Sequence, residues 1–99
     1  MNPFRLTPAA ADDLFGIWAY IAKQNLSAAD RLEFGLLEAC QQVADRPDLG
    51  HWRHDLTNKP VRFFTVRGTY LIAFDPASVP LEVVRIFHGA QDVATDLDG

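Results

Sequence analysis

The amino-acid sequence predicts an α+β fold in the order β-α-α-β-β-β, in which an antiparallel sheet carries a helical hairpin on one face. In the first half of the chain, apolar residues recur at helical spacing in two stretches separated by a short link. In the second half, three runs rich in Val, Phe, Tyr and Ile are separated by turns that contain Gly or Pro. The 99 residues include no internal repeat or linker, so we expect a single domain over residues 1–99.

The first predicted elements are a short strand, "FRLT", and a helix over residues 8–24. Thr7 is a suitable N-cap, and Pro8 suits the first helical position, where a missing N–H costs little. One face of this helix collects apolar residues at helical spacing, namely Ala10, Leu14, Ile17, Trp18 and Ile21. We expect this stripe, including Trp18, to lie in the core.

The second helix follows the link "QNLS". Ser27 with Asp30 resembles a capping box in which Asp replaces the usual Glu. The apolar stripe of this helix consists of Ala29, Leu32, Leu36, Cys40 and Val43. The helix is expected to end before Pro47, because proline disfavours the α conformation in the residue before it. Since the link is short, the two helices are expected to form an antiparallel hairpin.

After a loop, the stretches "VRFFTV", "RG" and "TYLIAF" indicate a β-hairpin. Arg67–Gly68 fits a two-residue turn, because glycine readily takes a positive φ. A turn of this length places Phe64 opposite Leu71. A second turn, "DPASVP", leads to the last strand, "LEVVRIFH", which Gly89 ends.

This register divides the side chains of the sheet between two faces. The face assigned to the helices holds Val61, Phe63, Thr65, Tyr70, Ile72 and Phe74. The other face holds Arg62, Phe64, Val66, Leu71 and Ala73, and the last strand adds Val83, Arg85 and Phe87. This second face is largely apolar, yet the chain offers only one helical hairpin to cover a sheet. Either the C-terminal tail or a partner must cover this face. Because the tail is short and acidic and cannot cover all of it, we expect a partner protein to do so.

Phe34 also points to a partner, because it lies on the polar side of its helix. A single exposed Phe is also ordinary for a soluble protein, so Phe34 alone decides nothing. The predicted partner-binding residues are Phe34, Arg62, Phe64, Leu71, Val83, Arg85 and Phe87.

The composition excludes several classes of protein. Nine basic residues against thirteen acidic ones give a net charge of −4, which argues against a nucleic-acid binder. No apolar run approaches the roughly 20 residues of a membrane span, and the N-terminus lacks a signal-peptide pattern. Cys40 is the single cysteine, so a cytoplasmic location is expected. His51, His54 and Asp55 lack a fourth ligand, so neither a metal nor a cofactor is predicted.

The sequence resembles the RelE/ParE toxin superfamily, specifically its ParE-like branch. The stretches that carry the resemblance cover nearly the whole chain in the family order: "LTPAAADDLFGIWAYIAKQN", "AADRLEFGLLEAC", "RPDLG", "RHDL", "VRFFTVRGTYLIAF" and "VVRIFHGAQD". The resemblance implies the toxin component of a type II toxin–antitoxin system. It also implies a hetero-oligomer in which the C-terminal segment of a cognate antitoxin wraps the toxin. ParE-type toxins are known as inhibitors of DNA gyrase, whereas RelE-type toxins cut mRNA on the ribosome.

The two branches require different chemistry. RelE-like cleavage needs groups that activate a ribose 2′-OH, stabilise charge on the phosphate and protonate the leaving oxygen. Leu71 stands where RelE-like toxins carry an Arg, and Ala90 and Gln91 stand where they carry basic residues. We therefore predict no catalytic residues and a toxin that acts by binding its target. The alternative is a ribosome-dependent mRNA endonuclease that uses Arg62, Arg85 and His88.

The stretch "RIFHGAQD" also admits a structural role. His88 and Asp92 are predicted to lock the C-terminus to the sheet. His88 would hydrogen-bond the backbone at the Gly89 turn, and Asp92 would accept hydrogen bonds from Arg62 and Arg85. Alternatively, the two arginines bind acidic groups of the antitoxin.

The loop before the β-hairpin offers no functional site in the sequence. Arg53 and Asp55 are expected to fix the loop by contacting each other. Trp52 fits a buried loop anchor and a partner contact equally well, because its ring is apolar and its N–H is polar.

Overall fold

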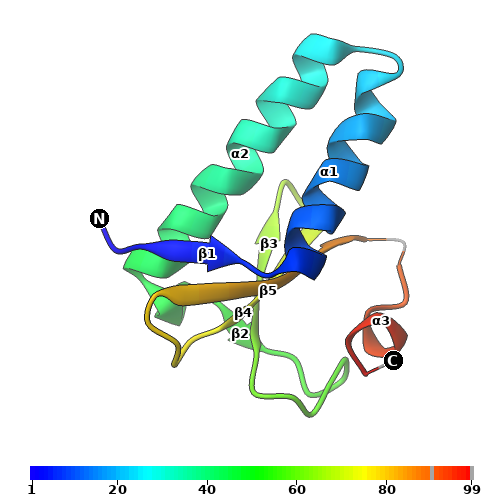
Figure 1. The fold of residues 1–99 in the computed structure, drawn as a ribbon. Coiled ribbons are helices and arrows are strands. Elements are labelled where there is room, and N and C mark those ends of the chain that lie inside the picture. Colours follow the sequence, from blue (N-terminus) through cyan, green and yellow to red (C-terminus); the bar gives the residue numbers. More distant parts are fainter. Residues whose placement is uncertain (90, 99) are drawn as a thin grey trace.

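The computed structural model describes residues 1–89 and 91–98. Two long helices lie across one face of a five-stranded sheet, and a short third helix lies at the C-terminus (Figure 1). The helices are α1 (Pro8–Ala22), α2 (Leu26–Asp45) and α3 (Val93–Asp98), and a 3₁₀ turn, η1, spans Pro47–Leu49. The strands are β1 (Phe4–Leu6), β2 (His51–Trp52), β3 (Arg62–Val66), β4 (Tyr70–Asp75) and β5 (Leu81–His88). The predicted α+β class, a sheet with a helical hairpin, is confirmed.

The sheet has the strand order β1-β5-β4-β3-β2 and is mixed, which corrects the prediction of a wholly antiparallel sheet. β1 runs parallel to β5, with Phe4 opposite Leu81, and the other pairs are antiparallel. Parallel pairing is possible because the chain between β1 and β5 passes through both helices and three strands rather than a tight turn. The sequence did not predict β2 and α3, because elements of two and six residues are too short to show a periodic pattern.

The N-terminus of α1 forms as predicted. The Thr7 hydroxyl accepts a hydrogen bond from the Ala10 N–H at 3.0 Å, and Pro8 occupies the first helical position. The helix ends at Ala22, two residues before the predicted end. At this end the Gln24 N–H donates to the Ile21 carbonyl three residues back, a tighter 3₁₀-type bond that is common in the last turn of a helix.

The cap of α2 differs from the prediction. Asn25, rather than Ser27, is the N-cap, and its side-chain oxygen accepts from the Ala28 N–H at 2.9 Å. The Ser27 hydroxyl instead accepts a hydrogen bond from Arg31. The predicted apolar stripe of this helix is fully or almost fully buried, and the helix ends at Asp45, before Pro47.

The turn between β3 and β4 is one residue longer than predicted. Arg67 and Gly68 both have positive φ, but pairing begins with Val66 opposite Tyr70, so Thr69 joins the connection. Phe64 therefore faces Ile72 rather than Leu71. A shift of one residue moves a whole strand's side chains to the opposite face, so the predicted faces were wrong for β3 and right for β4.

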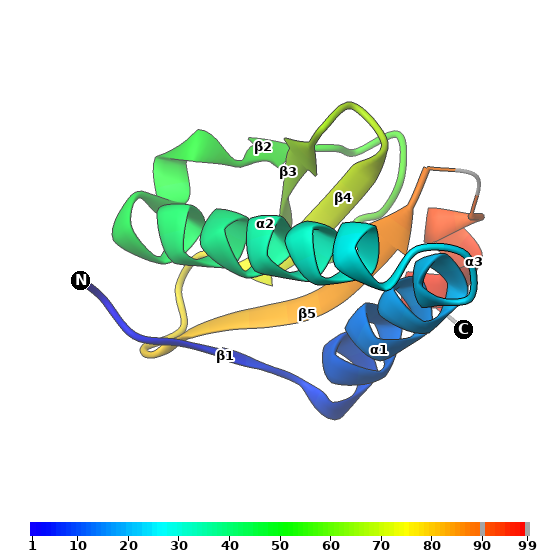
Figure 2. The same cartoon turned by 90° about the horizontal axis from the view of Figure 1, so that it is seen from above.

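The face toward α1 and α2 carries the larger core. Seen from above, α2 lies across β3 and β4, and α1 lies beside β5 (Figure 2). Tyr70, Ile72 and Phe74 of β4 and Val83 and Ile86 of β5 pack against the buried stripes of both helices. Phe64 and Val66 are half-buried against the same cluster. Phe64 and Val83, predicted for the uncovered face, thus belong to the helix side.

The chain itself covers the second face of the sheet, which corrects the prediction that a partner must do so. Val61, Phe63, Ala73 and Phe87 form a second core with Val93 and Leu97 of α3, and Leu56 packs beside it. Phe87 is fully buried and Leu71 is half-buried. Two short segments suffice, because α3 and the loop before β3 each contribute apolar side chains to this face.

Candidate protein-binding surface

Arg85 and Asp13 form an ion pair between α1 and the sheet. The Asp13 carboxylate accepts from Arg85 Nε at 2.7 Å and from Arg85 Nη2 at 2.9 Å. The same carboxylate accepts from the Ile86 backbone N–H at 2.9 Å. β1 pairs only with residues 81–83, so β5 is an edge strand beyond that point. Asp13 therefore satisfies a backbone donor of that free edge.

Arg85 also contacts the C-terminal helix. Its Nη1 donates to the Asp96 carbonyl at 3.0 Å, and its guanidinium lies 5.1 Å from the Phe87 ring centroid. Arg85 connects the C-terminal helix to the sheet, as predicted, but the carboxylate predicted to bind it was wrong. The carboxylate that it binds is Asp13 of α1, not Asp92. Hydrogen bonding to Asp13 raises the pKa of Arg85 above its ordinary value.

Asp92 acts on the helix that it precedes. Its carboxylate accepts from the Thr95 N–H at 3.2 Å and from the Thr95 hydroxyl at 2.8 Å. These hydrogen bonds lower the pKa of Asp92 below its ordinary range. Asp92 thus caps α3, the helix that covers the sheet. Asp92 therefore helps to hold the C-terminus by capping a helix and not, as had been predicted, by binding Arg62 or Arg85.

His88 ends β5 at the mouth of a turn. Its backbone N–H donates to Gln91 Oε1 at 2.7 Å, and the Gln91 N–H donates to its carbonyl at 3.0 Å. The imidazole packs edge to face against the Tyr70 ring, with centroids 5.5 Å apart. The turn is therefore closed by the backbone of His88 together with Gln91. Ala90, where the sequence also lacks a basic residue, lies outside the described residues.

Arg62 is bound to the loop that follows α2. Its Nη1 donates to the Pro47 carbonyl at 3.2 Å, and its guanidinium lies 4.8 Å from the Trp52 ring centroid. The His54 ring also stacks on Trp52, with ring centroids 6.5 Å apart. Trp52 is 45% exposed, which excludes the fully buried anchor. Contact of Trp52 with a partner stays a prediction.

The three residues considered for RNA cleavage do not converge. Arg62 lies opposite Phe74 on the helix side of the sheet, whereas Arg85 lies opposite Ala73 on the other side. β4 lies between their strands, so the backbones of β3 and β5 are about 10 Å apart. The two side chains are further apart still, because they project from opposite faces of the sheet. His88 lies opposite Tyr70, about 13 Å along β4 from the Arg62 level.

The loop contact predicted between Arg53 and Asp55 is present. Arg53 donates to the two carboxylate oxygens at 2.9 and 2.8 Å. Each side chain shifts the other's titration: the pKa of Arg53 is raised and the pKa of Asp55 is lowered by this hydrogen bonding. His54, which lies between Arg53 and Asp55 in the sequence, stacks on Trp52. The described residues include no cluster of three metal-ligating side chains.

The outer surface of the helical hairpin exposes large apolar side chains. Phe34 is 64% exposed and Phe15 is 67% exposed. Trp18 stacks on Phe15, with ring centroids 6.1 Å apart, and donates its indole N–H to Asp30 of α2. Trp18 is therefore half-buried at the helix–helix seam, which corrects the prediction that it lies in the core. Tyr20 and Leu26 are also exposed, by 72% and 58%.

Phe15 and Phe34 lie at the same level of the hairpin. The Trp18–Asp30 hydrogen bond sets position 18 of α1 beside position 30 of α2. In an antiparallel pair, three residues back on α1 corresponds to three or four residues forward on α2, which brings Phe15 level with Phe34. We call Phe15, Trp18 and Phe34 the outer aromatic patch. The sequence analysis predicted only Phe34 as a partner contact. Phe15 was not predicted, because it follows a residue of the apolar stripe of α1 and leaves that face only through the 100° rotation between neighbouring helical residues.

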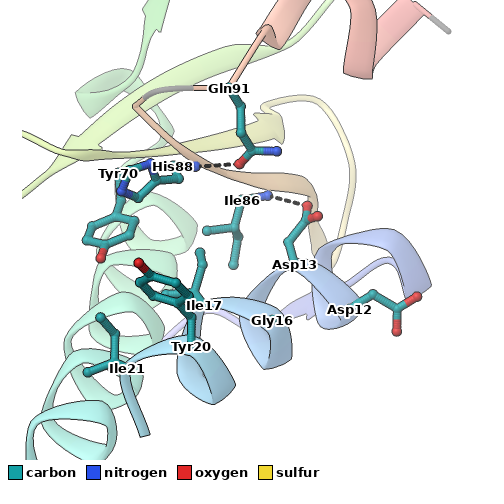
Figure 3. A pocket seen from close by; sticks show the side chains of 10 residues that line it. All are labelled: Asp12, Asp13, Gly16, Ile17, Tyr20, Ile21, Tyr70, Ile86, His88 and Gln91. Atoms are coloured by element: carbon teal, nitrogen blue, oxygen red, sulfur yellow. Dashed lines mark hydrogen bonds between the residues drawn. The ribbon is translucent and has the colours of Figure 1, made fainter. Parts of the chain in front are cut away.

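A pocket opens between α1 and the ends of β4 and β5 (Figure 3). It has a volume of about 480 Å³. Its lining residues are Asp12, Asp13, Gly16, Ile17, Tyr20, Ile21, Tyr70, Ile86, His88 and Gln91. The sequence had pointed to His88 alone among these as a candidate site residue, because the pocket is formed by α1 together with strands that lie far from it in the chain.

These features describe a small α+β protein whose strand arginines hold its own elements together and whose exposed aromatic side chains lie on its helical hairpin. Residues 4–93 match the family model of the ParE toxin of the type II toxin–antitoxin system parDE. The chain therefore belongs to the ParE toxin family of type II toxin–antitoxin systems.

A solved structure, the chromosomal ParDE toxin–antitoxin system from P. aeruginosa, has a similar fold. It matches with a TM-score of 0.74 and 19% sequence identity, over 89% of this chain and 96% of that chain. At this identity the likeness concerns the fold. No curated protein sequence matches the chain. Within the described residues, no helix combines the length and apolar character that crossing a membrane requires.

Proposed function

We propose that this protein is a toxin that acts by binding DNA gyrase and that a cognate antitoxin neutralises it by covering the outer surface of the helical hairpin. The target follows from the ParE family, whose members are known as gyrase inhibitors. The observation that carries the antitoxin surface is the outer aromatic patch, where Phe15 and Phe34 are 67% and 64% exposed. Aromatic side chains are enriched where proteins bind one another.

Action by binding, and not by RNA cleavage, is supported by the positions of the polar side chains. Arg62 and Arg85 project from opposite faces of the sheet, and each is engaged by the chain's own groups. Stabilising the charge of a phosphate in a transition state requires cations aimed at one point. Arg62, Arg85 and His88 offer no such point in this arrangement, which weakens the ribonuclease alternative.

The target is tested by expressing the chain alone and purifying it for two assays run in parallel. We expect growth arrest in cells, inhibition of DNA supercoiling by purified gyrase, and intact transcripts in a cell-free translation reaction. Transcript cleavage that disappears in Arg62→Ala and His88→Ala would instead favour the endonuclease. Absence of growth arrest on expression would leave only a scaffold that binds an antitoxin.

The antitoxin surface is tested with the protein encoded beside this chain. A double variant, Phe15→Ser with Phe34→Ser, should weaken its binding at least tenfold while leaving the melting temperature unchanged. Val79→Ser is the matched control, because Val79 is 92% exposed in the loop between β4 and β5, near the C-terminal end of α2 and not at the outer aromatic patch. Equal binding by the double variant and the wild type would show that the hairpin surface is not the interface.

A further inference from the structure

The pocket beside α1 has an open row of three helical positions as one wall. Asp12, Gly16 and Tyr20 follow one another at four-residue spacing, so they lie in line along the same side of α1. Gly16 leaves the middle of this row empty, since a Cβ added there would meet no atom within 4 Å. The row thus has a carboxylate at one end, a phenol at the other and a gap between them (Figure 3).

The floor and the far wall of the pocket are apolar and aromatic. Ile17 and Ile86 provide aliphatic surface, and Ile86 is 1% exposed because the fold packs around it. Tyr70 of β4 faces Tyr20 of α1, and their hydroxyl ends point toward one another (Figure 3). His88 fixes the Tyr70 ring by packing edge to face against it. The volume of about 480 Å³ lies in the range of about 300–1,000 Å³ found for ligand pockets.

The charge of the pocket is negative. No lysine or arginine is among its lining residues. The Asp13 carboxylate is neutralised by Arg85. Asp12 is exposed at the rim and makes no hydrogen bond or ion pair with any other described residue. A carboxylate without a cationic neighbour at one end of the pocket, with two electron-rich rings at the other, attracts a cation and repels phosphate or carboxylate groups.

We propose that this pocket binds the side chain of an arginine or lysine presented by a protein partner. The aliphatic stem packs on Ile17, Ile86 and the tyrosine rings, and the charged head lies toward Asp12, where it stays in contact with water. The gap at Gly16 gives the stem its path along α1. The same chemistry is offered by a free alkyl cation, so the experiment includes a probe for that source.

The test is a titration of the isotope-labelled chain, followed by NMR, with N-acetyl-arginine amide and with its uncharged isostere N-acetyl-citrulline amide. We expect the arginine derivative to shift the amide resonances of Gly16, Ile86 and Gln91 and to bind at least fivefold more tightly than the citrulline derivative. Equal binding of the two, or shifts of the same resonances by inorganic phosphate, would overturn the assignment. The chain is used alone, so the result does not depend on gyrase being the target.

Two variants locate the site. Gly16→Leu places a side chain in the gap, where a Cβ meets no atom within 4 Å, and it favours the helix. We expect the variant to fold and to weaken binding of the arginine derivative at least tenfold. Asp12→Asn should weaken it at least threefold. The matched controls are Ala11→Leu, at an exposed position of α1 outside the pocket, and Glu38→Gln, an exposed acid of α2, and neither should change binding. Unchanged binding in Gly16→Leu would place the ligand elsewhere.

The source of the cation is distinguished by comparing a capped Ala-Arg-Ala peptide with agmatine, a free alkylguanidine. A protein partner predicts that the peptide binds at least threefold more tightly, because its flanking residues add contacts at the rim. Agmatine binding as tightly as the peptide would overturn the assignment to a protein partner.

Discussion

Arg85 and Asp13 connect three elements that lie far apart in the sequence. The two side chains are 21% and 14% exposed, and their paired hydrogen bonds are short, at 2.7 and 2.9 Å. A third hydrogen bond holds the Ile86 N–H to the same carboxylate, and Arg85 reaches α3 through the Asp96 carbonyl. α1, β5 and α3 therefore share one polar contact, which explains why an arginine in an apolar strand is tolerated.

Replacing Asp13 by Ala should lower the free energy of unfolding by about 3 kcal/mol, because it leaves a partly buried guanidinium and a backbone N–H without their acceptor. Urea denaturation of the purified chain measures the change. Asp12→Ala is the control: Asp12 is the next acid along the helix, is exposed and has no described partner, so its removal should change stability by less than about 0.5 kcal/mol. Similar losses in both variants would contradict the structural role of Asp13.

Cys40 is fully buried in α2, and desolvation raises its pKa to about 12. The thiolate is the reactive form, so the folded protein should not react with a thiol reagent at pH 8. We expect no colour with Ellman's reagent over an hour in native buffer and one thiol per chain in concentrated guanidinium chloride. Rapid labelling of the native chain would show that α2 opens readily at this position.

One of the two elements that the sequence did not predict, α3, decides whether the sheet has a free face. Val93 and Leu97 supply the apolar contact, and the sheet side holds the helix through Lys59, which donates to the Leu97 carbonyl, and through Arg85. Six residues cannot form a stable isolated helix in water. Its stability therefore comes from the cap at Asp92 and from packing on β5 and its neighbours.

The capping of α3 should depend on pH. The pKa of Asp92 is lower in the folded chain than in an unfolded one, where it is near 3.9. Its contribution is therefore complete above about pH 4 and is lost as the pH falls through the lowered folded pKa. Hydrogen exchange of the α3 amides should accelerate, relative to the intrinsic rate, between pH 5 and pH 2.5 in the wild type. In Asp92→Asn this extra acceleration should be absent, and Glu38→Gln should behave like the wild type.

Packing of α3 is tested with Leu97→Ala. Leu97 is 7% exposed, and shortening a buried leucine costs about 2 to 3 kcal/mol when the cavity cannot close. Leu26→Ala removes the same atoms from a leucine that is 58% exposed, and it should cost less than about 0.5 kcal/mol. Thermal unfolding compares the two. Equal melting temperatures would mean that α3 does not cover the sheet in solution.

At the scale of the whole molecule, the charge of the chain limits what it can bind. The net charge is −4, and Arg62, Arg85 and Arg53 are engaged by the chain's own groups. Non-specific binding to DNA requires several free cations aimed at phosphates. The proposed binding to gyrase should therefore use protein surface and involve no DNA contact of the toxin's own.

Titration of a fluorescent DNA duplex should accordingly show no saturable binding up to about 10⁻⁴ M protein at physiological salt, the weak end of ordinary non-specific affinity. Fluorescence anisotropy makes the measurement, and a basic DNA-binding protein titrated in parallel is the positive control. Micromolar binding that weakens with added salt would contradict the inference and would restore nucleic acid as a candidate target.

Sequence patterns predicted the helical hairpin and its stripes well, since helical periodicity extends over fifteen and twenty residues in α1 and α2. They failed at the turn between β3 and β4, where Thr69 joins the connection, so the side chains of β3 lie on the faces opposite to those predicted while those of β4 lie as predicted. Phe64 and Val83 moved to the helix side for this reason and because β5 has an irregular register near Phe74. The pairing of Arg85 with Asp13 spans 72 residues, and no local pattern encodes it.

The amino-acid sequence alone determined the α+β class, the two long helices with their buried stripes, the negative charge and the family resemblance, because each of these depends on local spacing or composition. Only the tertiary structure decided which sheet face is covered, where Arg62 and Arg85 find their partners, and that a pocket lies beside α1. Those properties arise from strand register and from contacts between distant segments. A shift of one residue in a turn is enough to change them, while it leaves every local pattern intact.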